Sequence, residues 1–203
     1  MKNNLAKQLF NLKKDINDSI IAKKSLLNLN TQIHKAILKL YSKISNGGKV
    51  FLCGNGGSAA DAQHLAAELL VRLRPNFNRR SLPAISLATD TSTITACGND
   101  YDFNDLFARN LDALGCKNDV LIVITTSGTS KNIIKVLAKA KQKKIFSIGF
   151  LGKKGGKAKA NCDLPIIVGS SSTARIQEAH IFLGHFIFQN VEDLLFSKKK
   201  KFL

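Results

Sequence analysis

One short segment limits what this chain can fold into. An apolar run with strand character, residues 49–53, ends in the glycine-rich residues 54–58, and an alanine-rich helical stretch starts directly afterwards. Glycine reaches positive φ at little cost and leaves space for a ligand beside the backbone. A strand, a glycine-rich turn and a helix N-terminus form a phosphate cradle, because backbone N–H groups and the helix dipole point at one place. The segment predicts an α/β protein that binds an anionic group.

Apolar strands and helical patterns alternate through the rest of the chain. Strands of nearly continuous apolar character, such as residues 120–124, are typical of parallel sheets buried on both faces. Their alternation with helices predicts a three-layer α/β/α fold with a doubly wound parallel sheet. The expected strands are 49–54, 84–89, 119–126, 144–151 and 164–168. The expected helices are 58–73, 103–114, 130–143 and 173–196.

The sequence indicates one domain, residues 1–203, because this length suits a single α/β core and no linker or repeat divides it. Residues 1–46 are expected to form an N-terminal helical segment without strands. Apolar residues recur there at helical spacing in two stretches, and Asn46 with two glycines stops the second. Residues 197–203 are a basic tail.

The net charge of +17 raises the question of nucleic acid binding. Lysine and arginine are spread over helices and loops without interleaved aromatic residues, and the chain has no tryptophan. Base stacking needs aromatic platforms, and scattered positive charge gives non-specific affinity only. We therefore expect a solvated basic surface and no specific nucleic acid partner.

Cysteine usage and apolar segments indicate the compartment. The four cysteines stand far apart without a CxxC pair, which favours reduced thiols over disulfides or a zinc–cysteine site. The N-terminus lacks an apolar signal core, and no segment has the uninterrupted apolar length of a membrane span. These patterns predict a cytoplasmic protein without a membrane partner.

A second glycine-containing loop, residues 125–130, follows the most apolar strand. Its hydroxyls precede a predicted helix, so it is a second candidate anion site at the same carboxyl edge of the sheet. A helix cap would also place serine or threonine there, but the run of hydroxyls is denser than a cap needs. The pattern is neither a Walker A loop nor GxGxxG, which disfavours nucleotide chemistry.

The helix after the first loop carries a candidate reactive pair. His64 and Glu68 are four residues apart, so both project from one face of that helix, close to the phosphate cradle. A carboxylate and an imidazole can act as acid and base, or as metal ligands. The combination predicts an enzyme that acts on a phosphorylated small molecule.

Other polar residues cluster around residues 99–105 and in the long apolar last helix, which contains Gln177, His180 and His185. A histidine on so apolar a helix is usually a core residue. At about 100° per residue, the two histidines flank the direction of Gln177 on opposite sides. Spacing alone leaves open which histidine joins a functional site.

Taken in order, the motifs are similar to those of one family. CGNGGS, DAxHxAxE, GND, FND, TSGxS and RIQE with a later histidine resemble the phosphoheptose isomerases, a bacterial branch of the SIS, or sugar isomerase, superfamily. The resemblance covers residues 5–196. It implies an SIS-type fold with a five-stranded parallel sheet, and a homotetramer whose active sites lie between subunits.

The resemblance also implies a reaction and its residues. Sedoheptulose 7-phosphate is converted to D-glycero-D-manno-heptose 7-phosphate through an enediolate, the first step towards ADP- or GDP-heptose for lipopolysaccharide and other bacterial surface glycans. Glu68 and His185 match the acid/base pair, and the choice of His185 over His180 rests on this match. One zinc ion per subunit is implied at His64, Glu68, Gln177 and His185. The implied substrate-binding residues are Asn55, Gly56, Gly57, Ser58, Glu68, Asn99, Asp100, Thr125, Thr126, Ser127, Ser130 and Gln177.

One position departs from the family pattern. Ala174 precedes the RIQE segment, where many relatives carry aspartate and non-enzymatic superfamily members carry a small residue. The alternative function is therefore a non-catalytic SIS-type module that binds a sugar phosphate or a replication initiator. Such modules typically lack the helix glutamate and the late histidine, so Glu68 and His185 favour the enzyme.

Overall fold

In the computed structural model, residues 2–196 are described, with side chains from residue 11 onwards; the basic tail at 197–203 lies outside the described residues. Five strands form one sheet in the order β2-β1-β3-β4-β5, and every neighbouring pair is parallel. The five-stranded parallel sheet is confirmed. The strands are β1 (Val50–Gly54), β2 (Ala84–Ser86), β3 (Val120–Thr125), β4 (Phe146–Leu151) and β5 (Leu164–Ile167).

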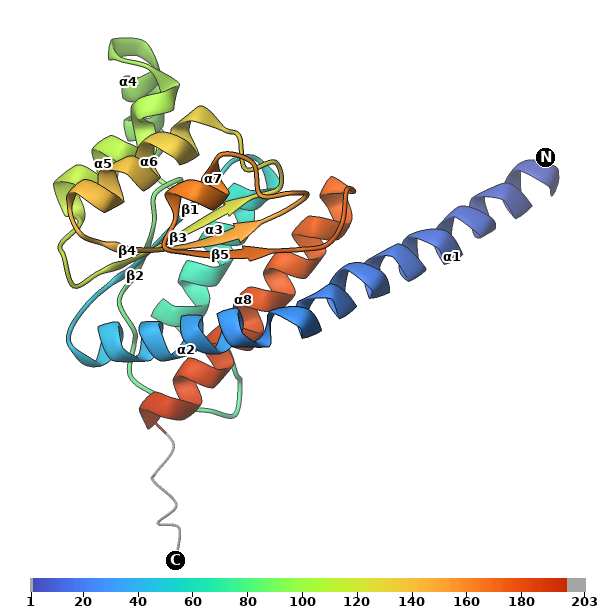
Figure 1. The fold of residues 1–203 in the computed structure, drawn as a ribbon, viewed down its shortest axis with the longest axis horizontal. Coiled ribbons are helices and arrows are strands. Elements are labelled where there is room, and N and C mark those ends of the chain that lie inside the picture. Colours follow the sequence, from blue (N-terminus) through green and yellow to red (C-terminus); the bar gives the residue numbers. More distant parts are fainter. Residues whose placement is uncertain (1, 197–203) are drawn as a thin grey trace, which may run out of the picture.

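Helices surround the sheet on both faces (Figure 1). The α-helices are α1 (Lys2–Lys24), α2 (Asn30–Ser45), α3 (Gly57–Leu70), α4 (Thr91–Asp100), α5 (Leu106–Leu114), α6 (Lys131–Gln142), α7 (Ala158–Asn161) and α8 (Thr173–Phe196). A 3-10 turn at Ser25–Leu29 joins α1 to α2, as expected for two N-terminal helices, and a second one, Phe103–Asp105, precedes α5.

Two helices were missed by the sequence patterns. Helix α4 contains serines and threonines without a clear apolar stripe, and it begins because the Asp90 side chain accepts hydrogen bonds from the backbone N–H groups of Ser92 and Thr93. Helix α7 is a single turn of four residues. Strand β2 was expected to reach residue 89 but ends at Ser86, at the edge of the sheet.

The sheet separates two apolar cores. Alternate strand residues point to opposite faces: Leu52 packs with α2, α3 and α8, whereas Phe51 packs with α5, α6 and α7. Because both faces are covered, every residue of β1 and β3 is buried. This explains the nearly continuous apolar strands.

The parallel register brings the two glycine-containing loops together. Gly54, the last residue of β1, pairs with Ile124 of β3. The loops at 55–56 and 126–130 therefore leave the sheet from neighbouring strand ends, at the carboxyl edge where open parallel sheets bind ligands.

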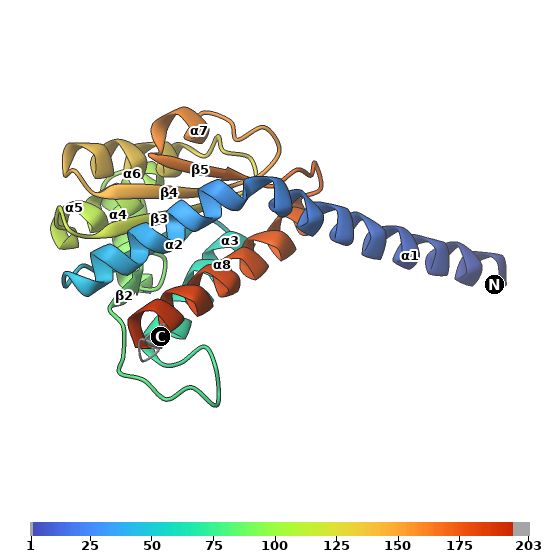
Figure 2. The same ribbon diagram turned by 60° about the horizontal axis from the view of Figure 1, so that its bottom comes forward.

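Helix α1 extends away from the rest of the fold (Figures 1 and 2). Leu12, Ile16 and Ile20 form a stripe at helical spacing on it, and all three side chains are exposed. No helix in residues 2–196 is both long enough and apolar enough to cross a membrane.

Candidate active site

The candidate site forms where α3 and α8 lie side by side. A Cβ placed on Gly184 of α8 would lie 2.5 Å from a methyl carbon of Leu65 in α3, so the two helices touch closely here. Further along, a Cβ on Gly57 would lie 2.6 Å from Nε2 of Gln177. The earlier residue of α3, Gly57, meets the earlier residue of α8, Gln177, and the later residue Leu65 meets the later residue Gly184. The two helices are therefore parallel. His64 precedes Leu65 on α3, and His185 follows Gly184 on α8, so the two histidines lie beside this contact.

Three side chains from the two helices meet at this contact. The Nε2 atoms of His64 and His185 are 2.9 Å apart, and His64 Nε2 is 3.2 Å from Oε1 of Glu68. One ligand atom from each residue lies within 4.8 Å of the others. His64 is exposed, while Glu68 and His185 are partly buried. The i, i+4 pair on α3 and the late histidine on α8 thus form one cluster.

The electrostatics of the cluster favour a neutral imidazole. Burial lowers the pKa of His185 from its usual value, and the neighbouring His64 lowers it further, against an opposite effect of Glu68. A neutral ring has a nitrogen lone pair that can accept a proton or bind a metal. Two imidazole nitrogens and a carboxylate oxygen are donors that zinc prefers, so the cluster fits such an ion.

The structure separates the two histidines of the last helix. His180 is fully buried, neither ring nitrogen has a hydrogen-bond partner among the described residues, and its ring lies 6.2 Å from that of Phe150. Burial lowers the pKa of His180 to about 4. His180 is therefore a neutral core residue, and His185 is the one that faces the cluster.

The first loop is held by a residue that the sequence analysis did not single out. Asn132, in the first turn of α6, exchanges two side-chain hydrogen bonds with Asn55, at 3.0 and 2.8 Å. Asn132 is 2% exposed, so this amide pair anchors the first loop to the buried side of α6. An asparagine near a helix start is common in any protein, and no local pattern distinguishes it. Gly56 has φ +56, as the turn requires, and Ser58 is buried in the first turn of α3.

The second loop turns back on itself at Gly128. This glycine has φ +67, and a Cβ there would lie 2.0 Å from the carbonyl oxygen of Gly155, so the loop packs tightly against the connection after β4. The buried Thr125 hydroxyl accepts a hydrogen bond from the Gly128 N–H. Thr126 and Ser127 are partly exposed at the loop surface.

Ser130 is the residue of this loop that stands where a helix cap is expected. It occupies the N-cap position of α6, yet its side chain makes no capping hydrogen bond. A serine that was placed there only as a cap would bond to a backbone N–H of the first turn. The Ser130 hydroxyl is therefore not used to cap α6.

Two sets of expected site residues lie away from the cluster. Gln177 packs against Gly57, at the N-terminal end of α3. Asn99 and Asp100 lie exposed at the end of α4 and are hydrogen-bonded to each other at 2.7 Å. A shallow pocket at Asp100 is lined by residues of α4, α5 and the connection between them. The single chain does not bring Asn99 or Asp100 to His64, Glu68 and His185.

Known proteins match the chain over most of its length. The family model of the SIS domain matches residues 18–152. Phosphoheptose isomerase 2 of Campylobacter jejuni is 51% identical over 184 residues, which are 89% of this chain and 90% of that protein. The phosphoheptose isomerase of Clostridium acetobutylicum is 47% identical over 91% of this chain and 94% of its own.

The chain belongs to the phosphoheptose isomerase family of SIS domain proteins. This is a family of enzymes, which confirms the enzymatic interpretation over the non-catalytic module. The solved phosphoheptose isomerase of Neisseria gonorrhoeae has a TM-score of 0.85 and 37% identity, covering 92% of this chain and 99% of its own. That of Francisella tularensis has a TM-score of 0.87 and 36% identity, covering 92% and 98%.

The buried His180 makes the protein sensitive to mild acid. In the unfolded chain a histidine takes up a proton near its usual pKa of 6.5, whereas in the fold His180 stays neutral down to about pH 4. The folded state is therefore favoured above pH 6.5, and this advantage is lost as pH falls from 6.5 towards 4. At pH 5 the loss is about 2 kcal/mol. We expect His180→Phe to reduce the fall of the unfolding temperature between pH 7.5 and 5.

The matched control for this prediction is His34→Gln, which removes an exposed histidine. It should keep the wild-type pH dependence of the unfolding temperature, measured by circular dichroism. If His180→Phe also kept it, the buried ring would not be the acid-sensitive group.

Proposed function

We propose that this protein interconverts sedoheptulose 7-phosphate and D-glycero-D-manno-heptose 7-phosphate, and so supplies heptose precursors for bacterial surface glycans. The observation that carries the proposal is the meeting of Glu68 with His185 beside two phosphate-type loops. The relatives named phosphoheptose isomerase support this substrate class.

The residue types suit ketose–aldose isomerisation. A proton leaves the carbon beside the carbonyl and returns to its neighbour through an enediolate. The Glu68 carboxylate takes and returns this proton, and the His185 imidazole moves the hydroxyl proton. A neutral imidazole can do so near pH 7, and the lowered pKa of His185 keeps it in that form.

The two loops hold the substrate by its anionic end and its hydroxyls. Thr125, Thr126, Ser127 and Ser130 surround the N-terminus of α6, where backbone N–H groups and the helix dipole favour a phosphate. Asn55, Gly56, Gly57 and Ser58 form the neighbouring wall at the N-terminus of α3. A phosphate fixed here leaves the sugar chain to extend towards Glu68.

A metal ion suits the same cluster. His64, Glu68 and His185 would hold zinc, and the ion when bound would act as a Lewis acid on the sugar oxygens. Gln177, the fourth ligand that the family resemblance implies, packs instead against Gly57 at the N-terminal end of α3. A carboxylate that ligates a cation is a weaker base than a free one. Glu68 is therefore the strongest base when its carboxylate is not bound to the ion.

We further propose a homotetramer with active sites between subunits. Helix α1 carries an exposed apolar stripe that its own chain does not cover. Leu27, just before α2, and Phe182 and Phe186, in the middle of α8, add exposed apolar surface. Burying such surface is the main driving force of association. A site shared between subunits also accounts for the position of Asn99 and Asp100, away from their own cluster.

The proposal also covers the compartment of the protein and the role of its basic surface. We propose a cytoplasmic protein, because the four cysteines are scattered along the chain without a CxxC pair. We assign no specific nucleic acid partner and no membrane partner, because the positive charge is accounted for by solvated lysines.

The direct test is an isomerase assay on sedoheptulose 7-phosphate with wild type and Glu68→Gln. The variant keeps the size and hydrogen bonding of the side chain but has no basic carboxylate, so turnover should fall by about 100-fold or more. Chelator treatment of the wild type should lower turnover as well. Product formation is followed by chromatography of the two sugar phosphates. A Glu68→Gln enzyme with normal turnover would remove Glu68 from the mechanism.

A second prediction concerns the phosphate. Ser127→Ala and Ser130→Ala remove hydroxyls that hold the phosphate equally in the ground state and in the transition state. We expect each to raise KM, by about 10-fold, more than it lowers kcat. Ser45→Ala, which removes an exposed hydroxyl at the end of α2, away from both loops, is the control. Comparable turnover of sedoheptulose without its phosphate would contradict the loop assignment.

A third prediction concerns assembly. Leu12→Glu with Ile16→Glu places two charges on the apolar stripe of α1, so the protein should no longer form tetramers in light scattering after size-exclusion chromatography. The control exchanges the exposed ion pair of the same helix, as Lys14→Glu with Asp18→Lys. This pair lies on the opposite face of α1, and the exchange should leave the tetramer intact. A wild type that is monomeric would overturn the proposed assembly.

A further inference from the structure

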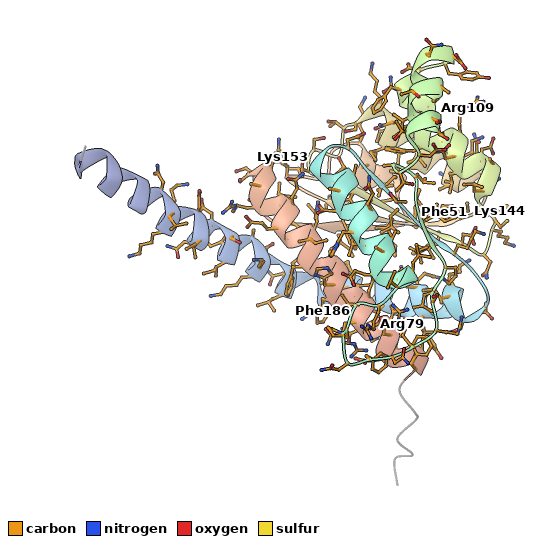
Figure 3. The ribbon with its side chains drawn as sticks, turned by 180° about the vertical axis from the view of Figure 1, so that it is seen from behind. Phe51, Arg79, Arg109, Lys144, Lys153 and Phe186 are labelled. Carbon is orange, nitrogen blue, oxygen red and sulfur yellow. The ribbon has the colours of Figure 1, made fainter. Side chains whose placement is uncertain are left out.

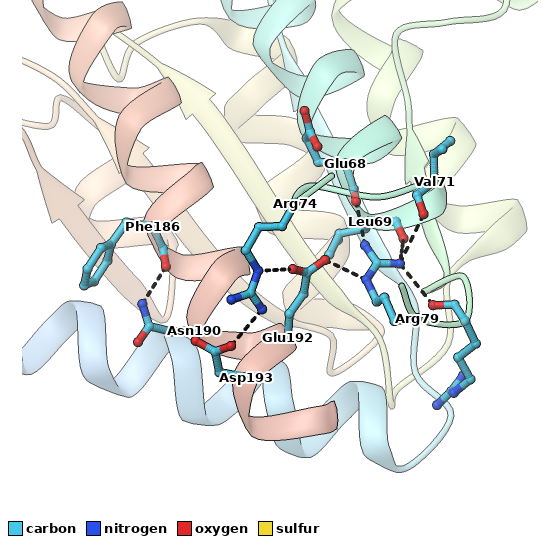
Figure 4. A network of polar contacts seen from close by, with 10 residues as sticks. Glu68, Leu69, Val71, Arg74, Arg79, Phe186, Asn190, Glu192 and Asp193 are labelled. Atoms are coloured by element: carbon cyan, nitrogen blue, oxygen red, sulfur yellow. Dashed lines mark hydrogen bonds and ion pairs between the residues drawn. The ribbon is translucent and has the colours of Figure 1, made fainter. Parts of the chain in front are cut away.

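The end of α3 is held by a buried arginine that lies outside the substrate loops. Arg79, on the connection between α3 and β2, donates from Nη2 to the Glu68 carbonyl oxygen at 2.7 Å and from Nη1 to that of Leu69 at 2.9 Å (Figures 3 and 4). Carbonyl groups in the last turn of a helix have no partner within the helix. The guanidinium therefore caps α3 at the backbone of Glu68 itself.

The same arginine is tied to the other helix of the cluster. Its Nε donates to Oε1 of Glu192 at 2.6 Å, and both side chains are at most 1% exposed. Glu192 is seven residues after His185 on α8, which is two helical turns further along nearly the same face. One chain of hydrogen bonds thus joins the backbone of Glu68 to the helix that carries His185.

Stability alone does not account for this pair. Replacing a buried ion pair by apolar side chains of similar size is often neutral or stabilising, because the desolvation of two charges is avoided. Apolar side chains cannot donate to backbone carbonyl groups. A planar guanidinium can hold two carbonyl groups and a carboxylate at once. The arrangement therefore favours a geometric role.

We propose that Arg79 is a positioning residue: it locks the last turn of α3 to α8 and so sets the Glu68 carboxylate against His64 and His185. Gly184 allows the helices to touch, and the Arg79–Glu192 pair fixes the rotation of α3 one turn beyond the contact. The inference rests on the proposed function, because it concerns the placement of the proposed base.

A neighbouring arginine provides a matched control. Arg74 donates from Nε to Oε2 of the same Glu192 at 3.1 Å and from Nη2 to Asp193 at 2.7 Å, but it has no hydrogen bond to α3 among the described residues (Figure 4). Arg74→Met therefore removes an arginine from the same network and leaves the cap of α3 in place.

The test compares Arg74→Met with a double variant, Arg79→Met with Glu192→Met. Arg79→Met alone would leave Glu192 with a buried charge paired only with Arg74, so the single variant is not used. The double variant removes both charges together, so we expect it to fold. Circular dichroism and size-exclusion chromatography establish the folded, assembled fraction, and all rates are expressed per folded chain.

Two readouts separate positioning from stability. In the double variant, kcat should fall at least about 10-fold while KM changes less than about 2-fold, because both phosphate loops are untouched. The affinity of the metal-stripped protein for Zn²⁺, measured by competition with a chromophoric chelator, should weaken about 10- to 100-fold, as for other residues that orient metal ligands. Arg74→Met should change neither quantity more than about 2-fold.

The outcomes distinguish this inference from the proposed function. A folded double variant with the kcat and Zn²⁺ affinity of the wild type would overturn the positioning role, and so would equal losses in Arg74→Met. A wild type that does not isomerise sedoheptulose 7-phosphate would overturn the proposed reaction. The Zn²⁺ affinities would still decide the positioning role, because they require no turnover.

Discussion

The close parallel packing of α3 against α8 is the contact on which the candidate site depends. It requires a residue without a side chain at Gly184, since a Cβ there would collide with the fully buried Leu65. Interior packing is dense, so an added methyl group would force the helices apart. His64 and His185 are the residues next to this contact, and their 2.9 Å separation follows from it. The buried Arg79–Glu192 pair holds the same two helices further along.

The sheet fixes the other half of the site. Parallel pairing of β1 with β3 brings the two loops to one edge. The first loop is anchored by α6, and the second by the connection after β4. Asn132 of α6 holds Asn55 by two side-chain hydrogen bonds, and Gly128 packs on Gly155. The N-termini of α3 and α6, which follow these loops, therefore lie at the same edge of the sheet. Under the proposed function, this edge of the sheet binds the phosphate of the sugar next to the neutral imidazole of His185.

The exposed apolar surface of the chain is informative as well. The exposed apolar stripe of α1 and the exposed phenylalanines of α8 are unusual beside so basic a surface. Lysines keep the remaining surface hydrated, and the net positive charge attracts anionic substrates without choosing among them. Selectivity for a phosphosugar must therefore come from the loops and the cluster. The apolar stripe provides the surface through which copies of the chain are proposed to join.

The sequence by itself determined the layers of the fold, because apolar periodicity reports directly which faces are buried. It also determined both loops and the His64–Glu68 pair, since their members are close along the chain and local geometry relates them. It missed α4, whose start depends on one capping aspartate rather than on periodicity. No local pattern indicated Asn132, whose partner Asn55 is 77 residues away, or Arg79, whose partners Glu68 and Glu192 are 11 and 113 residues away. Helix geometry alone did not decide between the histidines of α8, and the family resemblance pointed to His185. The tertiary structure supplies the physical reason: packing against Phe150 buries His180, while the contact at Gly184 places His185 against α3. Helical spacing places the two histidines on either side of the Gln177 direction. The choice depends on the element that each one packs against, which is β4 for His180 and α3 for His185.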